Sequence, residues 1–296
     1  MALDDTVDPT TSLQNLLNLS PADGAQTDED IFVGGSQPEP RKRVFGGQVL
    51  GQSLVAAANT VEPGRLMHSM HGYFLRPGDS ELPITFGVQR LRDGRSFSAR
   101  RTHAYQNGVP ILSMIASFQV PGEGLDHQVQ MPDGVPDPES LPTTAELLKG
   151  IDHPVAKAWS HQRPMDIRHI EKPVYFEAGP DKVARNAVWM KSFGPLEGDQ
   201  NLQRAALAYA SDYTLLESVL RRHGLAWSAP GMSVASLDHA MWWHRPLRVD
   251  EWLLYVQESP SASGARGLAS GRIFNRAGEL VATVAQEGMV RVPEMP

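Results

Sequence analysis

The chain has 296 residues, of which 41% are hydrophobic and 21% charged, a balance typical of a globular protein of one large or two ordinary domains. It has no cysteine, which excludes disulfides, thiol nucleophiles and cysteine-based zinc sites, and its net charge of −7 argues against nucleic acid as a partner. No apolar run reaches the ~18 residues of a membrane helix, so no membrane insertion is expected, and the acidic start MALDDTVDPTT lacks the features of a secretory signal, which predicts a cytoplasmic protein.

The first half of the chain predicts one thin helix followed by four strands. Residues 1–25 are polar around a short helical turn, LQNLLNL. The helix is expected at 45–61, FGGQVLGQSLVAAANTV, where each glycine costs about 1 kcal/mol and therefore indicates close packing against another backbone. Four alternating segments separated by Gly, Asp and Asn turns then predict strands, namely MHGYFLRP, LPITFGVQRLRD, RSFSARRTHAYQ and PILSMIASFQV.

The second half returns to the same order after a break. Residues 123–165 are rich in proline and acid and predict a linker, with a short helix at TTAELLKG. Two strands, PVYFEA and NAVWMKSFG, are expected before one long amphipathic helix, NLQRAALAYASDYTLLESVLRRHG, that ends at Gly224. The remaining strands are expected at MSVASLDHAMWWH, EWLLYVQES, GARGLASGRIF and ELVATVAQEGMVRV.

One phrase occurs in both halves. Placing the Arg-Pro pair of MHSMHGYFLRPG on that of LDHAMWWHRPL, a shift of 169 positions (245 − 76), also aligns Phe74 with Trp243. Consecutive strands after one helix favour an antiparallel sheet packed on that helix. We therefore expect an α+β fold built by internal duplication, with units at 28–122 and 166–296.

The strong local signatures of catalysis are absent from the sequence. It contains no G-x-S-x-G, no phosphate-binding loop, no H-E-x-x-H and no G-x-G-x-x-G, so no cofactor is expected. His239 and His244 lie five apart on an expected strand and would point to opposite faces, which argues against a metal site. Any catalysis must then use scattered polar residues that the fold brings together.

Three polar residues stand out. Asp212 belongs to the apolar stripe of its helix, where an unpaired charge is costly, although a structural Asp held by backbone N–H groups is the alternative. Ser236 lies two positions before Asp238 on an expected strand, so the two side chains should share a face, and Gln286 interrupts the apolar alternation of ATVAQEG. Both also have an ordinary explanation: Ser236 is a serine tolerated in a strand, and Gln286 is a glutamine satisfied within the core. The stripe that contains Asp212 consists of Ala205, Ala208, Tyr209, Leu215, Leu216 and Val219.

A resemblance links these residues. RVFGGQVLGQSLVAA, MHGYFLRPG, AYASDYTLL, LDHAMWWHRP, DEWLLY, SASGARG and QEGMVR resemble segments of the acyl-CoA thioesterase II family, in order, over roughly residues 30 to 292. The resemblance implies a double hotdog fold, two helix-and-sheet units fused in one chain. It also implies a catalytic trio of Asp, Ser or Thr, and Gln, which falls on Asp212, Ser236 and Gln286.

Such a trio suits a thioester, whose carbonyl is already activated, because an anionic Asp can take a proton from a water that a hydroxyl and an amide hold in place. Partial burial is expected to raise the pKa of that Asp. We expect the oxyanion donors at the glycine-rich helix start, Gly46, Gly47 and Gln48.

The substrate implied by the resemblance is an acyl-CoA. Arginines of RKR, Arg41 to Arg43, and of RLRDGRSFSARR, residues 90–101, are expected to meet its phosphates. Trp242, Trp243 and the methionines are candidates to line an acyl tunnel. Exposed sheet edges favour a homodimer or a larger homo-oligomer.

Two other functions stay open at this point. A hydratase or dehydratase of the same fold pairs the helix Asp with a His about five residues later, where this chain has Glu217. A non-catalytic acyl-CoA-binding module is the second possibility, against which the presence of all three polar residues argues.

Overall fold

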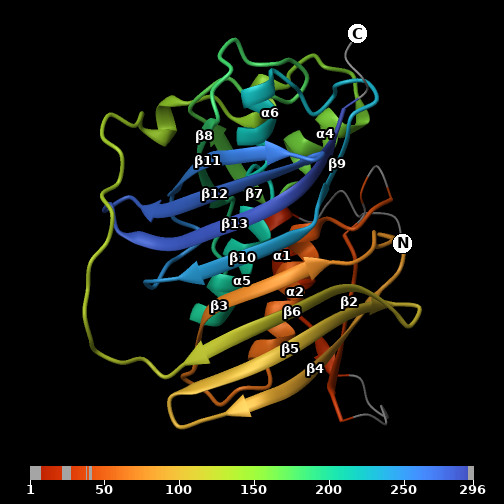
Figure 1. The fold of residues 1–296 in the computed structure, drawn as a ribbon, viewed down its shortest axis with the longest axis vertical. Helices are drawn as coiled ribbons and strands as arrows, with labels where there is room; N and C mark the ends of the chain where they lie inside the picture. The colour runs from red at the N-terminus through yellow and green to blue at the C-terminus, as the bar shows by residue number, and fades with distance from the viewer. Residues whose placement is uncertain (1–7, 22–27, 38, 40–41, 293–296) are drawn as a thin grey trace.

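The computed structural model describes residues 8–21, 28–37, 39 and 42–292. The outer ends of the expected N-terminal arm and of the second unit therefore lie outside the described residues. Over those residues, one 13-stranded antiparallel sheet curves around two central helices (Figure 1). The expected α+β fold is confirmed.

The first unit follows the predicted order of one helix and four strands. A short helix, α1 (Pro9–Leu16), precedes the strands β1 (Ser20–Pro21) and β2 (Asp30–Gly34). The predicted thin helix is α2 (Gly46–Ala58). The four strands after it are β3 (Leu66–Phe74), β4 (Ile84–Asp93), β5 (Phe97–Gln106) and β6 (Val109–Gln119).

The second unit follows a long connection that runs along the left edge of the view in Figure 1. This connection contains η1 (Pro138–Ser140), α3 (Thr144–Leu147) and α4 (Pro154–His161). The unit begins with β7 (Met165–His169), β8 (Arg185–Ser192), α5 (Gln200–Ser211) and α6 (Glu217–His223). It ends with β9 (Ser233–Ser236), β10 (Asp238–Trp243), β11 (Leu253–Ser263), β12 (Arg266–Asn275) and β13 (Leu280–Arg291).

The strand order reflects the duplication. It runs β1-β2-β4-β5-β6-β3-β10-β13-β12-β11-β8-β7, so each unit presents the strand that carries the repeated phrase to the other. The two units join there through antiparallel pairing of β3 and β10, with Met70 opposite Met241. Both methionines are fully buried in the main core, which extends across the join.

Helices α2 and α5 lie against each other inside the curved sheet and run in opposite directions. A Cβ on Gly47 would lie 2.2 Å from the Tyr209 carbonyl oxygen, and one on Gly51 would lie 3.2 Å from that of Ala205. The glycines therefore permit the two backbones to approach, as their cost inside a helix predicts. The antiparallel arrangement places the beginning of α2 beside the end of α5.

Two secondary-structure predictions are wrong. PVYFEA, residues 173–178, is not a strand, because the carbonyls of Val174 and Tyr175 accept hydrogen bonds from Trp227 and Ser228 in a loop. The strand at this sheet edge is β7 instead, whose first residue falls within the expected linker. The long helix expected at 201–224 is also interrupted, and it continues only as α6.

Candidate active site

The interruption of the long helix occurs at Asp212. This residue caps the C-terminus of α5 with φ −81° and ψ −7°. The N–H groups of Tyr213 and Glu217 bond to carbonyls three residues back instead of four, which tightens the backbone locally. This turn separates α5 from α6. Because α5 and α2 run in opposite directions, the carboxylate at the end of α5 lies beside the beginning of α2, at the junction of the two units.

The structure brings the three candidate side chains together. Gln286 Nε2 lies 2.9 Å from Asp212 Oδ1 and 2.6 Å from Ser236 Oγ. Ser236 Oγ in turn donates to the same Asp212 oxygen at 3.3 Å. The amide nitrogen of Gln286 thus uses one hydrogen for each partner, and the three groups are close enough to hold a common water molecule.

Burial changes the acidity of the carboxylate. The side chain of Asp212 is half-buried at the wall of a cavity, and this desolvation raises its pKa from 3.8 to about 6. Hydrogen bonds from Gln286, Ser236 and the Gly47 N–H oppose this rise without cancelling it. The phenols of Tyr213 and Tyr255, which face this carboxylate, have raised pKa values for the same reason and stay neutral. Asp212 is therefore an anion at neutral pH and a stronger base than an exposed Asp.

A break between β9 and β10 sets which side chains face the core. Ser236 ends β9 and pairs with Gly288, whereas β10 begins two residues later. The inward positions change from even to odd across this break, so Ser236 and the buried His239 both point inward. The expectation that Asp238 shares the face of Ser236 is wrong, because its carboxylate accepts the Glu287 N–H instead. His244 is exposed on the opposite face from His239, as expected.

His239 is a residue of the site that the sequence did not reveal. It is 1% exposed, and its Nδ1 lies 2.7 Å from Gln286 Oε1 on the side of the carboxamide away from Asp212. The available signal was its position three residues after Ser236. That signal became meaningful only when the strand break placed both side chains on one face.

The expected oxyanion donors have different surroundings. Gly46 lines the cavity described below, and a Cβ there would lie 2.6 Å from Asp212 Oδ2. The Gly47 N–H donates to the Asp212 carboxylate. Gln48 is buried elsewhere: its side chain bonds to Gln37 and Gly35, and its N–H to the Phe45 carbonyl. Its side chain therefore belongs to the packing of α2 and does not line the cavity.

A cavity of about 1140 Å³ opens beside Asp212. Such a volume exceeds the ~300–1,000 Å³ of ordinary small-molecule pockets and suits a large ligand. The expected linker supplies one wall, because α4 contributes Val155, Trp159 and its neighbours. Apolar side chains from both units form much of the remaining wall, including Val44, Phe45, Val49, Phe74, Ile111, Leu216, Trp227 and Val234.

The aromatic and methionine residues expected in an acyl tunnel lie elsewhere. Trp243 is 4% exposed and belongs to the core, and Trp242 lies edge-on to His71. Neither tryptophan lines the cavity, and among the described residues no methionine does. These parts of the prediction are wrong, because the alternation of β10 directs the two rings to the core and to the outer face of the sheet.

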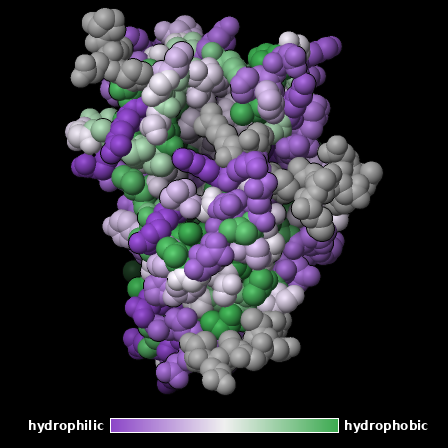
Figure 2. Space-filling model, turned by 90° about the vertical axis from the view of Figure 1, so that its right-hand side faces the viewer, coloured by the Kyte–Doolittle hydropathy of each residue, from purple (hydrophilic) through white to green (hydrophobic). Residues whose placement is uncertain are grey.

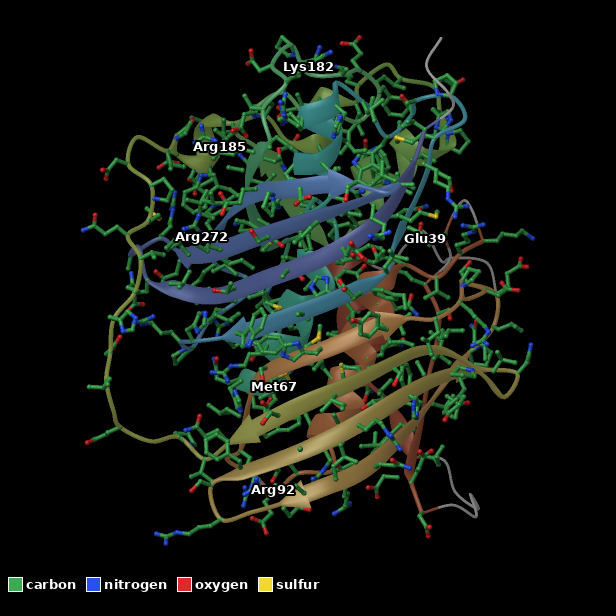
Figure 3. All side chains as sticks on the ribbon, in the orientation of Figure 1. Glu39, Met67, Arg92, Lys182, Arg185 and Arg272 are labelled. Atoms are coloured by element: carbon green, nitrogen blue, oxygen red, sulfur yellow. The ribbon has the colours of Figure 1, made fainter. Side chains whose placement is uncertain are left out.

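Among the described residues, four cations line the cavity, Arg43, Arg76, Lys157 and Arg163. The guanidinium of Arg163 lies 4.8 Å from the ring centre of Trp159 and 4.6 Å from that of Tyr213, so two aromatic faces hold it. Beside it, burial raises the pKa of Glu39 to about 7, against the lowering effect of the Arg163 charge. Figure 3 labels Glu39 beside β9, and Figure 2 shows this side of the molecule, where hydrophilic and hydrophobic residues are interspersed.

Of the arginines expected to bind phosphate, some line the cavity and others do not. Arg43 lines the cavity, whereas Arg41 lies outside the described residues. The arginines at 90–101 do not line it: Arg90 pairs with Asp30 and Arg100 with Asp93. Arg90 thus links β4 to β2 and Arg100 links β5 to β4, and a role of these arginines in binding phosphates stays a prediction.

The matching end of the helix pair in the first unit lacks these groups. The Arg-Pro shift of 169 positions places Ser236 on Met67 (236 − 169). The shift of 170 positions that aligns Gly278 with Gly108 places Gln286 on Ala116 (286 − 170), and both counterparts are buried. The beginning of α5 fills this place, because Asn201 Oδ1 accepts the Met67 N–H and Arg204 donates to the Met67 carbonyl. Figure 3 labels Met67 near the middle of the sheet, well away from Glu39. In the part of the chain that the structure describes, this polar trio therefore occurs at one end of the helix pair only.

Two further features concern the part of the chain that the structure describes. No group of three or more His, Cys, Asp or Glu there is placed to hold a metal ion. No helix among those residues has the length and apolar character needed to span a membrane.

Comparison with known protein families covers both units. The model of the acyl-CoA thioesterase family matches residues 160–289, and that of the acyl-CoA thioesterase N-terminal domain matches residues 36–119. Together the two matches span more than half of the chain.

Similar proteins match over nearly their whole length. Acyl-CoA thioesterase 2 of Haemophilus influenzae is 38% identical over 95% of this chain and 99% of its own. Human acyl-coenzyme A thioesterase 8 is 38% identical over 97% of this chain and 93% of its own. The crystal structure of acyl-CoA thioesterase II TesB2 from Mycobacterium marinum superposes with a TM-score of 0.77 at 42% identity, over 95% of this chain and 99% of that chain.

The continuous sheet around two antiparallel helices, with one polar trio beside a large cavity, defines a double hotdog enzyme. The similarity to thioesterases of this architecture extends through both units. The chain belongs to the acyl-CoA thioesterase family, whose members are thioester hydrolases.

Proposed function

We propose that the protein hydrolyses fatty acyl-CoA to free fatty acid and coenzyme A by direct attack of water, with Asp212 as the general base. The observation that carries the proposal is the half-buried carboxylate of Asp212, hydrogen-bonded by Ser236 and Gln286 at the wall of a large cavity. Family membership supports the reaction, and the geometry supports the roles of the residues.

The chemistry follows from the charge states. Asp212, with a pKa of about 6, is ionised at neutral pH and accepts a proton from the bound water. The resulting hydroxide attacks the thioester carbonyl carbon, and the tetrahedral intermediate expels the coenzyme A thiolate. The proton held by Asp212 then passes to that thiolate, so the carboxylate is restored and no covalent enzyme intermediate forms.

The oxyanion of the tetrahedral intermediate is assigned to the beginning of α2. The backbone N–H groups at a helix N-terminus carry partial positive charge and favour an anion. Gly46 lines the cavity and lies against Asp212 Oδ2, so its lack of a side chain leaves room for the reacting carbonyl. Gly47 acts on the base through its hydrogen bond to Asp212.

The cavity provides distinct surroundings for the two parts of the substrate. Its apolar walls are suited to a fatty acyl chain. Arg43, Arg76, Lys157 and Arg163 are suited to the phosphates of coenzyme A, because guanidinium and ammonium groups are the usual partners of phosphate.

The two alternative functions fit less well. A hydratase would need a second acid-base group near Asp212, but Glu217 is fully buried and bonds to His169, Asn186 and Trp227. Glu217 does not line the cavity. A non-catalytic binding module would have no need of a buried anion, whose desolvation is costly.

The test measures thiol release from palmitoyl-CoA by the wild type and by Asp212→Asn. We expect the substitution to lower kcat at least about 1,000-fold, because the general base contributes ~10²–10⁴-fold and positions the water as well. Asp238→Asn is the matched control, since that carboxylate lies on the next strand and binds the Glu287 N–H; it should retain activity. Turnover that survives Asp212→Asn would overturn the assignment of Asp212 as the general base. Enoyl-CoA is offered to the wild type in parallel, and its hydration would favour the hydratase.

The cytoplasmic location and the homo-oligomeric state expected from the sequence stay predictions. Tyr73 and Ile115 on the β3–β6 region are 63% and 48% exposed, which is compatible with a contact between copies. Light scattering coupled to size-exclusion chromatography measures the oligomeric state directly.

A further inference from the structure

A chain of hydrogen bonds continues behind the catalytic trio. His239 lies between Gln286 and Ser211: its Nδ1 is 2.7 Å from Gln286 Oε1, and its Nε2 is 3.0 Å from Ser211 Oγ. His239, Ser211 and Gln286 are all 1% exposed or less. None of the three carries a charge at neutral pH, since burial lowers the pKa of His239 to about 4 although the hydrogen bond to Gln286 opposes this.

The donors and acceptors of this chain can be assigned in only one consistent way. Gln286 must direct its NH₂ group toward Asp212 and Ser236, because an ionised carboxylate only accepts hydrogen bonds. Its Oε1 therefore faces His239, where it too can only accept. Nδ1 of His239 must carry the hydrogen, and a neutral imidazole then has an acceptor at Nε2.

Ser211 supplies the matching donor. Its hydroxyl also lies 2.9 Å from the Ala208 carbonyl, so its one hydrogen has two possible acceptors. Donation to His239 Nε2 is the arrangement that avoids two facing lone pairs in a buried site, which would be costly. The order of donation is thus Ser211 to His239, His239 to Gln286, and Gln286 to Asp212 and Ser236.

We propose that His239 is a positioning residue for thioester hydrolysis: its Nδ1–H fixes the Gln286 carboxamide with both amide hydrogens toward Asp212 and Ser236. This inference rests on the proposed function of the trio. A carboxamide is nearly symmetrical in shape, so packing alone would hardly distinguish its two orientations. The reversed orientation would direct Oε1 at the carboxylate and remove two of the hydrogen bonds that organise the site.

The loss of His239 therefore has a signature that a structural role would not give. If Gln286 reverses, Asp212 loses a donor that lowers its pKa, and the pKa rises further. The acidic limb of the kcat–pH profile then moves to higher pH. Tyr213 and Tyr255, the titratable groups facing Asp212, stay neutral through this range because burial raises their pKa values.

Two substitutions separate the nitrogens of the ring. His239→Asn keeps an N–H donor near the position of Nδ1, whereas His239→Gln places its amide near Nε2 and leaves Gln286 Oε1 without that donor. We expect His239→Gln to lower kcat roughly 100-fold with little change in KM, the cost of a catalytic group misplaced by about 1 Å. Its acidic limb should move up by about one pH unit. His239→Asn should recover most of the lost kcat and restore the limb.

A second buried histidine provides the matched control. His169 is 3% exposed and bonds to Glu217 in the second unit, outside the cavity. His169→Gln is expected to lower the melting temperature without moving the acidic limb. If both Gln variants shift the limb equally, or if neither does, the positioning role is wrong.

A measurement on the wild type avoids any folding defect of the variants. Long-range ¹H–¹⁵N spectra of labelled protein should show His239 neutral with the hydrogen on Nδ1 at pH values from 5 to 8. A hydrogen on Nε2 would overturn the inference. Asp212→Asn, measured alongside, separates the proposed function from the role of His239. Activity in Asp212→Asn refutes the proposed function. An inactive Asp212→Asn together with wild-type behaviour of His239→Gln refutes only the role of His239.

Discussion

The raised pKa of Asp212 predicts that the group which serves catalysis also destabilises the fold. A carboxyl whose pKa is about 6 in the folded protein and 3.8 unfolded binds its proton more tightly when folded. The folded state therefore loses stability as pH rises through this range. By linkage the penalty is about 1.6 kcal/mol at pH 5 and about 3 kcal/mol at pH 8, where it is complete.

Asp212→Asn removes this pH-dependent penalty. The amide can keep its oxygen at the position of Oδ1, where it accepts from Gln286 and Ser236, and any cost of placing its NH₂ group at the other position does not vary with pH. The free energy of unfolding of the variant, relative to the wild type, should increase by about 1.4 kcal/mol between pH 5 and pH 8. His239, whose pKa burial lowers to about 4 in the folded protein, is present in both proteins, so its contribution to the pH dependence cancels.

Urea unfolding followed by tryptophan fluorescence at both pH values measures this difference. Met70→Leu, which leaves every titratable group in place, is the control, and its stability difference from the wild type should be the same at both pH values. A stability difference between Asp212→Asn and the wild type that is equal at pH 5 and pH 8 would refute the argument that burial raises this pKa.

Three further outcomes are expected. In thiol-release assays kcat should fall tenfold for each pH unit below about 6, where Asp212 is protonated, and level off above 7; a flat profile contradicts its role as base. Gly47→Ala should lower the free energy of unfolding by about 1–3 kcal/mol, measured in urea, because its Cβ would meet the Tyr209 carbonyl at 2.2 Å. Arg163→Ala should raise KM for palmitoyl-CoA about tenfold with kcat nearly unchanged, the worth of one charged hydrogen bond, whereas Arg90→Ala, outside the cavity, should leave KM as it is.

The sequence predicted those features that depend on neighbouring residues. Glycines inside α2 indicated a close backbone, which proved to be that of α5. A carboxylate in line with the apolar face of α5 indicated that Asp212 is withdrawn from solvent, because the period of the helix up to Ser211 fixes which residues share that face. The repeated phrase indicated the duplication, and its two copies form the pair of strands that joins the units.

Features that depend on distant pairing could not be predicted in this way. The break at Leu237 reverses which side of the strand faces inward, and alternation within a single sequence does not reveal such a break. The folding of α4 against the cavity depends on contacts made beyond a long connection, so Arg163 was not a candidate. His239 could be recognised only when both features were known.

The filled end of the helix pair shows what fusion of the two units made possible. In a symmetric pair of identical subunits, any residue that serves one end must also be tolerated at the other, so a change that improves packing at one place would remove catalysis at both. Covalent linkage frees the two copies to vary separately, and here Arg204 and Asn201 hold Met67 where the equivalent serine of the other half faces a cavity. Among the described residues, one end of the helix pair thus carries the polar trio, and the equivalent place in the other half anchors the core instead.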